Sequence, residues 1–446
     1  MTTAAQPEEA EEAEETEAST LAGAHVIVVG GGPAGLTAAT GLRAAGVGRV
    51  TVIEREQQAG GVPRHTDHLG FGLRDLRRLT TGPRYAERLR RAAHEADVQV
   101  RTSCTVIELT VGRSLARPAV VLADGTRLEA DAVVLATGVR ERPRAARLIP
   151  GDRPSGVYTT GAVQQHTALH HHRVGRRAVI VGAEHVSFSA IWSLRHGGCT
   201  TVAMITPLHR HQSVGALRLI AATARRIPVH TGVRLASIEG RPRVEAVVLD
   251  DGRRIACDTV VFTGDWVPDH EVAVRAGLMI TRGAGSPTIT SRFATSQPGV
   301  FAIGNLVHPA DAADQCALDG RAVVGPVIDW VVAGAGQRLD GRSWTAMTAP
   351  ITVEAPISWA SFSARGLTVR VVEHVVARVE VSCDGAVVAL GRRRHLVPNR
   401  SINVALPSGT VDAGRLIEVR LIEGAADRGA ARRHLRSLRN RTTALR

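Results

Sequence analysis

One plan of strand, glycine turn, helix and strand occurs twice in this chain, and the repeat constrains the fold more than any other feature. The first copy starts with an apolar strand and a glycine turn at residues 25–46, and the second starts in the same way at residues 177–198. Each copy later reaches an Asp-led apolar strand that ends at Thr-Gly, at residues 131–138 and 258–264. Apolar strands that alternate with helices predict an α/β protein with parallel sheets.

The second copy is predicted to be an insertion in the first, because the stretch "GVFAIGN" and the helix after it return to the first module. We therefore expect two Rossmann-like three-layer dinucleotide-binding modules followed by a small all-β domain, whose short β runs contain Gly and Pro turns. The expected division is a disordered acidic tail (1–23), the first module (24–150 and 271–345), the second module (151–270), the β domain (350–423) and a basic tail (424–446).

Composition excludes several classes of function. All 55 basic residues other than histidine are arginine, so Schiff-base and lysine P-loop chemistry are excluded. The net charge of +13 comes from scattered arginines without stacking aromatics, so we expect no nucleic-acid partner. No apolar run reaches the roughly 20 residues of a membrane span. Five widely spaced cysteines and an acidic N-terminus indicate a reducing cytoplasm. His166 and His170 have no acid or cysteine nearby, so no metal is expected.

The turn of the first copy has the spacing of a dinucleotide-binding site. Gly30 permits the tight turn, Gly32 lets backbone N–H groups approach a pyrophosphate, and Gly35 lets helix and strand pack closely. Glu54 ends the next strand, 22 positions after Gly32, where an acid binds the ribose hydroxyls of a dinucleotide. These residues together predict dinucleotide binding.

The chain resembles the pyridine nucleotide-disulfide oxidoreductases, flavoproteins with two dinucleotide-binding domains. The resemblance is carried by "GGGPAG" at 30–35, Gly60-Gly61, "ATG" at 136–138 and "GVFAIGN" at 299–305. It implies FAD in the first module and NAD(P)H in the second. Asn305 replaces the acid that holds the ribityl chain in the family, and an amide can still hydrogen-bond a hydroxyl. The implied FAD-binding residues are Gly30, Gly32, Pro33, Ala34, Gly35, Glu54, Arg55, Gly61, Arg64, Thr137, Gly138, Gly304 and Asn305.

The family's redox-active cysteine pair is missing, which excludes a dithiol relay. The corresponding segment reads "GGVPRHTDHLGFGLRDLRR" and should run towards the isoalloxazine. Histidine suits proton exchange near neutral pH, so His65 and His68 are the candidate catalytic residues. The alternative is that both only bond FAD or the loop backbone.

The turn of the second copy departs from the pattern, because Gly182, Glu184 and Ser187 occupy its three glycine positions. A carboxylate about 5 Å from a phosphate charge costs roughly 3 kcal/mol at an effective dielectric constant of about 20. We therefore expect a degenerate nicotinamide site that NADH and NADPH do not use, with Glu184 capping its own helix instead. NADPH binding through His209, Arg210 and His211 is the alternative.

A narrower resemblance follows from "GGVPRHTDH", "TGAVQQ" and the missing cysteines. The chain is similar to the FAD subunits of hydrogen cyanide synthase, opine oxidase and the sarcosine oxidase alpha type. This implies an FAD oxidoreductase that oxidises a small amine or hydroxy compound and passes electrons to a redox partner subunit, oxidase-like or iron–sulfur. The alternatives are an NAD(P)H-dependent flavin reductase and a structural flavoprotein.

Overall fold

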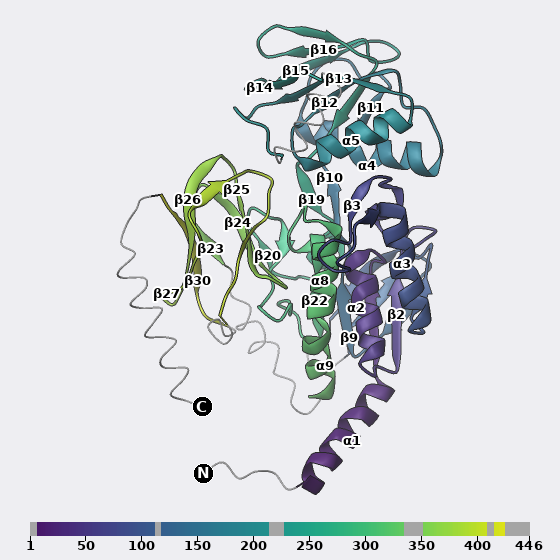
Figure 1. Cartoon of the computed structure of the whole chain (residues 1–446). Helices are drawn as coiled ribbons and strands as arrows, with labels where there is room; N and C mark the ends of the chain where they lie inside the picture. The colour runs from purple at the N-terminus through teal and green to yellow at the C-terminus, as the bar shows by residue number, and fades with distance from the viewer. Residues whose placement is uncertain (1–6, 112–116, 214–226, 334–350, 408–413, 424–446) are drawn as a thin grey trace.

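The computed structural model of this protein describes residues 7–111, 117–213, 227–333, 351–407 and 414–423 (Figure 1). The predicted basic tail at 424–446 lies outside these residues. As predicted, the fold is α/β, with two Rossmann-like modules and a C-terminal β domain. None of the helices in the described ranges has the length and hydropathy of a membrane span.

The first module is built on a five-stranded parallel sheet in the order β22-β9-β1-β2-β5. Strands β1, β9 and β22 are buried along their whole length, as their Val-rich sequences predict for a sheet covered on both faces. The strands are β1 (His25–Val29), β2 (Arg49–Ile53), β5 (Gln99–Arg101), β9 (Ala132–Leu135) and β22 (Val300–Ala302). The helices are α2 (Pro33–Ala44), α3 (Gly82–Glu95), α8 (Ala313–Ala322) and α9 (Val324–Val332).

The second module repeats this plan with a parallel sheet in the order β11-β18-β12-β13-β14. Helix α5 (His185–His196) follows β12, as α2 follows β1 in the first module. The strands are β11 (Val157–Thr159), β12 (Arg177–Val181), β13 (Thr200–Thr206), β14 (Val229–Thr231) and β18 (Thr259–Phe262). A short helix, α4 (Thr160–Gln164), continues into η3 (Gln165–Leu169).

Each module carries an antiparallel three-stranded sheet at the same place in its sequence, before the return strand. These strands are β6 (Val106–Thr110), β7 (Ala119–Leu122) and β8 (Arg127–Glu129) in the first module, and β15 (Leu235–Glu239), β16 (Ala246–Leu249) and β17 (Arg254–Ala256) in the second. The modules are joined by two antiparallel strands, β10 (Val139–Glu141) and β19 (Trp266–Pro268). Figure 1 shows the second module above the first, with these strands between them.

Short elements complete the two modules. They are η1 (Val62–His65), β3 (Leu69–Phe71), β4 (Thr80–Thr81), η2 (Arg144–Arg147), α7 (Glu271–Arg275), β20 (Ile280–Thr281), β21 (Ser286–Pro287) and η4 (Gly304–Leu306).

The C-terminal domain consists of β-strands that pack beside the first module (Figure 1). Buried residues of this domain, among them Phe362 and Val381, belong to the same hydrophobic core as the first module. The domain is therefore packed against the first module rather than tethered to it. Its strands are β23 (Thr352–Val353), β24 (Ile357–Ser363), β25 (Gly366–Val371), β26 (Val375–Cys383), β27 (Ala386–Leu390), β28 (Arg394–Leu396), β29 (Ile402–Val404) and β30 (Ile417–Ile422).

The N-terminal segment differs from its prediction. Residues 7–23 were expected to be disordered, but they form helix α1 (Pro7–Gly23), which reaches the first module near α9. Alanine and glutamate are strong helix formers, and Leu21 is buried at the end of the helix. High charge alone was therefore an incomplete argument for disorder.

Candidate functional site

The turn after β1 has the geometry that a pyrophosphate needs. Gly30 has a φ of +107°, and a side chain on Gly35 would lie 1.9 Å from the carbonyl oxygen of Gly30. Gly32 is open by contrast, because the nearest atom to an added Cβ is Cα of Gly61 at 4.0 Å. Helix α2 begins at Pro33 with no side-chain cap, which leaves its first N–H groups free for an anion.

Glu54 is 7 % exposed and braces this turn through both carboxylate oxygens. One oxygen accepts a hydrogen bond from the N–H of Gly31 and the other from the N–H of Glu56, each at 2.8 Å. The carboxylate therefore braces the glycine turn, and its contact with a ribose stays a prediction. These contacts fit the turn and the acid to a dinucleotide.

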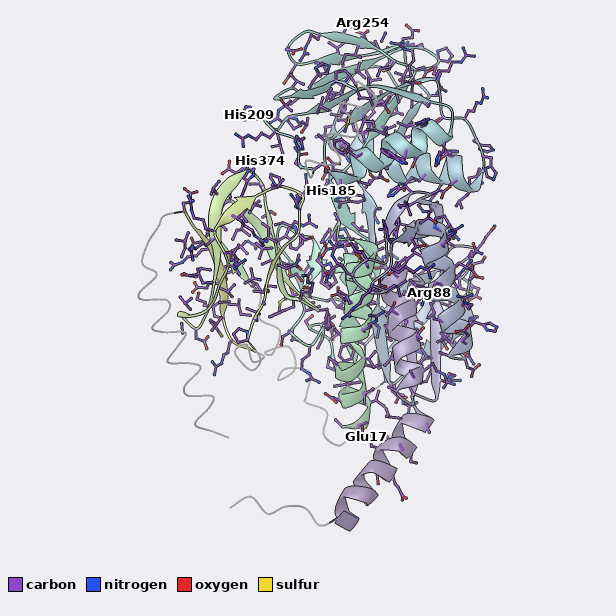
Figure 2. The ribbon with its side chains drawn as sticks, in the orientation of Figure 1. Glu17, Arg88, His185, His209, Arg254 and His374 are labelled. Carbon is purple, nitrogen blue, oxygen red and sulfur yellow. The ribbon has the colours of Figure 1, made fainter. Side chains whose placement is uncertain are left out.

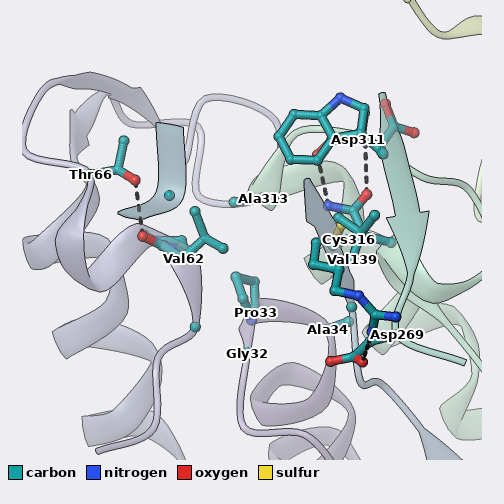
Figure 3. Close-up of a pocket in the computed structure, with 18 of the residues that line it drawn as sticks. Gly32, Pro33, Ala34, Val62, Thr66, Val139, Asp269, Asp311, Ala313 and Cys316 are labelled. Carbon is teal, nitrogen blue, oxygen red and sulfur yellow. Dashed lines mark hydrogen bonds and ion pairs between the residues drawn. The ribbon is translucent and has the colours of Figure 1, made fainter. Parts of the chain in front are cut away.

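A cavity of about 1470 Å³ opens from this turn and extends between the two modules and the C-terminal domain. Figure 3 shows Gly32, Pro33 and Ala34 at the start of α2, with Val62 and Ala313 on neighbouring segments. The predicted site residues that line it are Gly30, Gly32, Pro33, Ala34, Glu54, Arg55, Gly61, Arg64, His65, His68, Thr137, Gly138, Glu184 and Asn305. The predicted residues that do not line it are Gly35, Gly182, Ser187 and Gly304.

Asn305 forms a closed pair with Asp311, which Figure 3 labels among the residues that line the cavity. The N–H of Asp311 donates to Oδ1 of Asn305 at 2.8 Å, and Nδ2 of Asn305 donates to the carbonyl of Asp311 at 3.2 Å. An aspartate could accept the first bond but could not donate the second. The substitution therefore ties the loop before α8 to the cofactor position.

Asp269 contacts two of the predicted FAD-binding residues of the first module. Arg55 forms an ion pair with its carboxylate at 2.8 Å, and the hydroxyl of Thr137 donates to its carbonyl at 2.7 Å. Asp269 itself follows β19, so these contacts connect the cofactor position to the strands that join the modules.

His65 is 6 % exposed, and its pKa lies well below the ordinary value of histidine. Burial, followed by the charge of Arg64, lowers the pKa of His65 to about 4. His65 is therefore neutral at pH 7, and no described residue bonds its Nδ1. A proton-exchange role near neutrality is thus less favoured than hydrogen bonding for this residue.

His68 connects the two modules. Its Nε2 lies 2.6 Å from the Ser189 hydroxyl of α5, and its Nδ1 lies 2.8 Å from the carbonyl of Leu69. Gln164 of α4 adds a second link between this segment and α5. Its Nε2 donates to the hydroxyl of Ser189, and its Oε1 lies 3.3 Å from the hydroxyl of Thr66. The segment after Gly61 therefore reaches across to the second module.

Glu184 precedes α5 and is 6 % exposed. Its Oε2 accepts a hydrogen bond from the N–H of Ala183 at 2.9 Å, while Oε1 finds no partner in the described part of the chain. A side chain on Gly264 would come within 2.7 Å of this carboxylate. Glu184 and Ser187 also form a capping box at the start of α5, as expected for an acid that caps its own helix. The acid thus lies on the nucleotide turn, between the two strand ends where the sheet would receive a dinucleotide.

A second buried acid lies close to Glu184. Burial, together with the charge of Glu184, raises the pKa of Glu141 to about 7, against the bond it accepts from the N–H of Gly161. Arg147 approaches from the other side and donates to the carbonyls of Thr263 and Gly264 at 3.1 and 2.7 Å. Two acids and one guanidinium therefore lie where a pyrophosphate bound to the second module would need positive charge.

Several cavity residues were missed by the sequence analysis. They come from the second module and from the C-terminal domain, and include Gln164, Ser189, Trp192, Asn399 and Arg400. No local motif marks them, because only the packing of the three parts brings them together. The covariation of such positions between homologues is the signal that would have found them.

Cysteine and metal chemistry have no support in the described site. Cys104 and Cys316 line the cavity, but both are free thiols. No group of three or more His, Cys, Asp or Glu side chains suited to a metal ion occurs in the described ranges. The glycine turn, the free helix terminus and Glu54 fit FAD, which supplies hydride and single-electron chemistry when bound.

Comparison with known proteins identifies the family. The model of the pyridine nucleotide-disulphide oxidoreductases matches residues 24–320. The ferredoxin–NAD(+) reductase subunit of the benzene 1,2-dioxygenase system of Pseudomonas putida is 27 % identical over 306 residues, 63 % of this chain and 67 % of the relative. The ferredoxin reductase component of the chlorobenzene dioxygenase of Cupriavidus sp. (strain PS12) is 29 % identical over 296 residues, 63 % and 66 % of the two chains. The chain thus spans about two thirds of these relatives.

Solved structures agree on the fold. Lactococcus lactis thioredoxin reductase has a TM-score of 0.59 at 18 % identity, over 69 % of this chain and 99 % of that one. The putidaredoxin reductase–putidaredoxin complex has a TM-score of 0.55 at 19 % identity, over 86 % and 89 %. The narrower resemblance to hydrogen cyanide synthase, opine oxidase and sarcosine oxidase subunits stays a prediction. This chain belongs to the pyridine nucleotide-disulphide oxidoreductase family and is an FAD-dependent oxidoreductase.

Proposed function

We propose that this chain is a flavin-dependent reductase that takes electrons from NAD(P)H and passes them to a separate iron–sulfur protein. The relatives named above are ferredoxin reductases, and the chain has no cysteine pair through which electrons could leave as a dithiol. This replaces oxidation of an amine or hydroxy compound as the first choice. We place the reaction in a reducing cytoplasm, because all five cysteines are free thiols.

The observation that carries the proposal is an exposed apolar rim beside the cavity, between Val62 and Leu79. Its large apolar side chains are mostly in solvent, and two of them, Val62 and Leu69, also line the cavity. The exposed fractions are 55 % for Val62, 64 % for Leu69, 60 % for Leu73 and 52 % for Leu79. Exposed large apolar side chains that recur along one short segment favour a surface that contacts another protein.

The charge of the rim indicates the chemistry of its partner. Arg77 and Arg78 are exposed between Leu73 and Leu79, and neither makes an ion pair with a described residue. An acidic iron–sulfur protein would be attracted to such a surface and brought close to the flavin.

Glu184 sets the strength of nucleotide binding in this proposal. The second module keeps the strand order and the helix of a nucleotide site. The carboxylate of Glu184 adds a negative charge to the turn between them. The cost of roughly 3 kcal/mol corresponds to about a hundredfold loss of affinity. We therefore propose weak use of NAD(P)H, at millimolar rather than micromolar concentration.

A second candidate function is a dehydrogenase for a small amine or hydroxy compound, with an oxidase-like or iron–sulfur subunit as its partner. Two observations favour it, namely the acid on the nucleotide turn and a cavity larger than the roughly 300–1,000 Å³ of a single-ligand pocket. In this candidate the second module serves only to shape the cavity.

Anaerobic absorbance of the purified holoprotein separates the two candidates. Bleaching of the flavin by NADH or NADPH, saturating in the millimolar range, is the result expected of the reductase. If 10 mM of either nucleotide leaves the flavin oxidised for minutes, the reductase is excluded and the dehydrogenase is retained.

A further inference from the structure

The C-terminal β domain reaches the flavin cavity through the segment that leads into β29. Asn399, Arg400, Ser401 and Asn403 all line the cavity, together with residues of both modules. This placement gives the β domain a direct part in the site, beyond its packing against the first module.

A buried arginine fixes the position of this segment. The side chain of Arg370 is 4 % exposed, and its guanidinium donates to the hydroxyl oxygen of Ser401 at 3.0 Å. The same nitrogen donates to the carbonyls of Pro309 and Ala310, at 3.1 and 2.9 Å, in the loop before α8. The β domain and the first module are therefore joined immediately beside Arg400.

Hydrogen bonds continue from this segment to the cofactor position. The hydroxyl of Ser401 donates to the carboxylate of Asp311, and the N–H of Asp311 donates to Asn305 at 2.8 Å. Arg400 is thus held next to a chain of bonds that ends at the residue implied to bind the ribityl group.

The acids around this junction already have partners. Asp314 pairs with Arg74 at 2.9 Å, and Asp319 pairs with His308. Burial of His308 lowers its pKa. The negative charges of Asp319 and Asp311 together have the larger effect, and they raise the pKa of His308 to about 9. His308 is therefore charged at pH 7.

Arg400 carries part of the charge that remains. Asp311 faces His308 at 3.4 Å and also lies near the buried Arg370. Three acids thus meet three partners with positive charge, and Arg400 makes no ion pair with any residue that the structure describes. Arg365 of the same domain also lines the cavity and forms no ion pair with a described residue, so this wall carries unpaired positive charge.

His185 provides a neutral polar group on the facing wall. It is the first residue of α5, as labelled in Figure 2, and it is one of the residues that line the same cavity. Burial first, and then the charges of Arg400, Arg370 and Arg74, lower the pKa of His185. Its imidazole is therefore neutral at pH 7 and able to donate one hydrogen bond.

We propose that Arg400, assisted by His185, binds the carboxylate of a small organic molecule beside the flavin. A guanidinium matches a carboxylate with two parallel hydrogen bonds. Phosphate presents the same paired oxygens to a guanidinium, so the test below includes it. The inference rests on the proposed function only in requiring FAD in this cavity.

The test is a titration of the FAD-loaded protein with sodium acetate at constant ionic strength, followed by the difference spectrum of the flavin. Acetamide is the neutral isostere, and inorganic phosphate tests the dianion. We expect a saturable change with acetate alone. In Arg400→Gln the dissociation constant should rise at least tenfold, and in Arg400→Lys it should rise less. Arg393→Gln, an exposed arginine of the same domain outside the cavity, should match the unmodified protein.

Each outcome of this titration bears on the proposal. Equal spectral changes with acetate and acetamide, or an unchanged dissociation constant in Arg400→Gln, would overturn it. A response to phosphate but not to acetate would assign Arg400 to a dinucleotide phosphate instead. Loss of FAD from Arg400→Gln and Arg400→Lys would make Arg400 a flavin ligand and also contradict the proposal. A purified protein without FAD would instead refute the proposed function.

Discussion

Glu184 and Ser187 are joined across the first turn of α5, where the N–H of Glu184 donates to Oγ of Ser187 at 3.2 Å. Ser187 is fully buried, and its hydroxyl also lies 2.7 Å from that of Thr263 at the end of β18. Two of the three glycine positions of the nucleotide turn are therefore occupied by side chains that bond the turn itself. The turn is held closed by its own polar groups.

The double variant Glu184→Gly, Ser187→Gly is expected to lower the dissociation constant of NADH or NADPH by about a hundredfold. The reason is the loss of roughly 3 kcal/mol of charge repulsion and of a side chain from the approach to the backbone. Anaerobic flavin titration measures the constant. Glu184→Gln keeps the size of the side chain and removes its charge, so it should give most of the decrease in the dissociation constant that comes from electrostatics. An unchanged constant in both variants would show that Glu184 does not limit nucleotide binding.

Gly32→Glu is expected to abolish FAD binding, because it puts a carboxylate into the one open position of the turn. The readout is the ratio of flavin to protein absorbance after purification. Gly325→Glu is the matched control, since it adds the same side chain to open space on α9, away from the cavity. Stoichiometric flavin in Gly32→Glu would refute the assignment of this turn.

His65→Gln is expected not to change the shape of the pH–rate profile between pH 6 and 8. A group with a pKa of about 4 does not change its charge in that range. The profile is measured with a dye acceptor at saturating donor concentration. His68→Gln is a useful companion, because it breaks the contact with Ser189 without removing the flavin turn. A limb that disappears with His65, together with a rate loss of roughly 10²–10⁴-fold, would restore the proton-exchange role.

Glu141→Gln is expected to stabilise the protein above pH 7 and to change little at pH 5. The folded pKa of about 7 lies above the ordinary value of 4.5, so the fold favours the protonated acid. The stability that depends on this proton is present below about pH 4.5 and is lost as pH rises through 7. The gain at pH 8 is at most about 3 kcal/mol. Urea unfolding at the two pH values measures it, and equal stability changes at both would contradict the raised pKa.

The local parts of the site were predictable from sequence, and the assembled parts were not. Gly30, Gly32 and Glu54 act within one strand–turn–helix–strand unit, so their spacing alone places them. Arg400, Gln164 and Ser189 come from three separate places in the sequence and line one cavity only because the three parts of the protein pack together. The acidity of Glu141 and His65 depends on burial that no motif reports. Helix α1 was not predicted, because the high charge of this segment indicated disorder, whereas its Ala and Glu residues have a high helix propensity.

The most direct test of the account is anaerobic transfer of electrons from the reduced holoprotein to an oxidised [2Fe–2S] ferredoxin, followed by stopped-flow absorbance. We predict reoxidation of the flavin within seconds, with a rate that falls as salt is added and falls at least tenfold in Arg77→Glu, Arg78→Glu, but not in Arg393→Glu. A flavin that stays reduced for minutes in the presence of acidic and neutral ferredoxins alike would contradict the account.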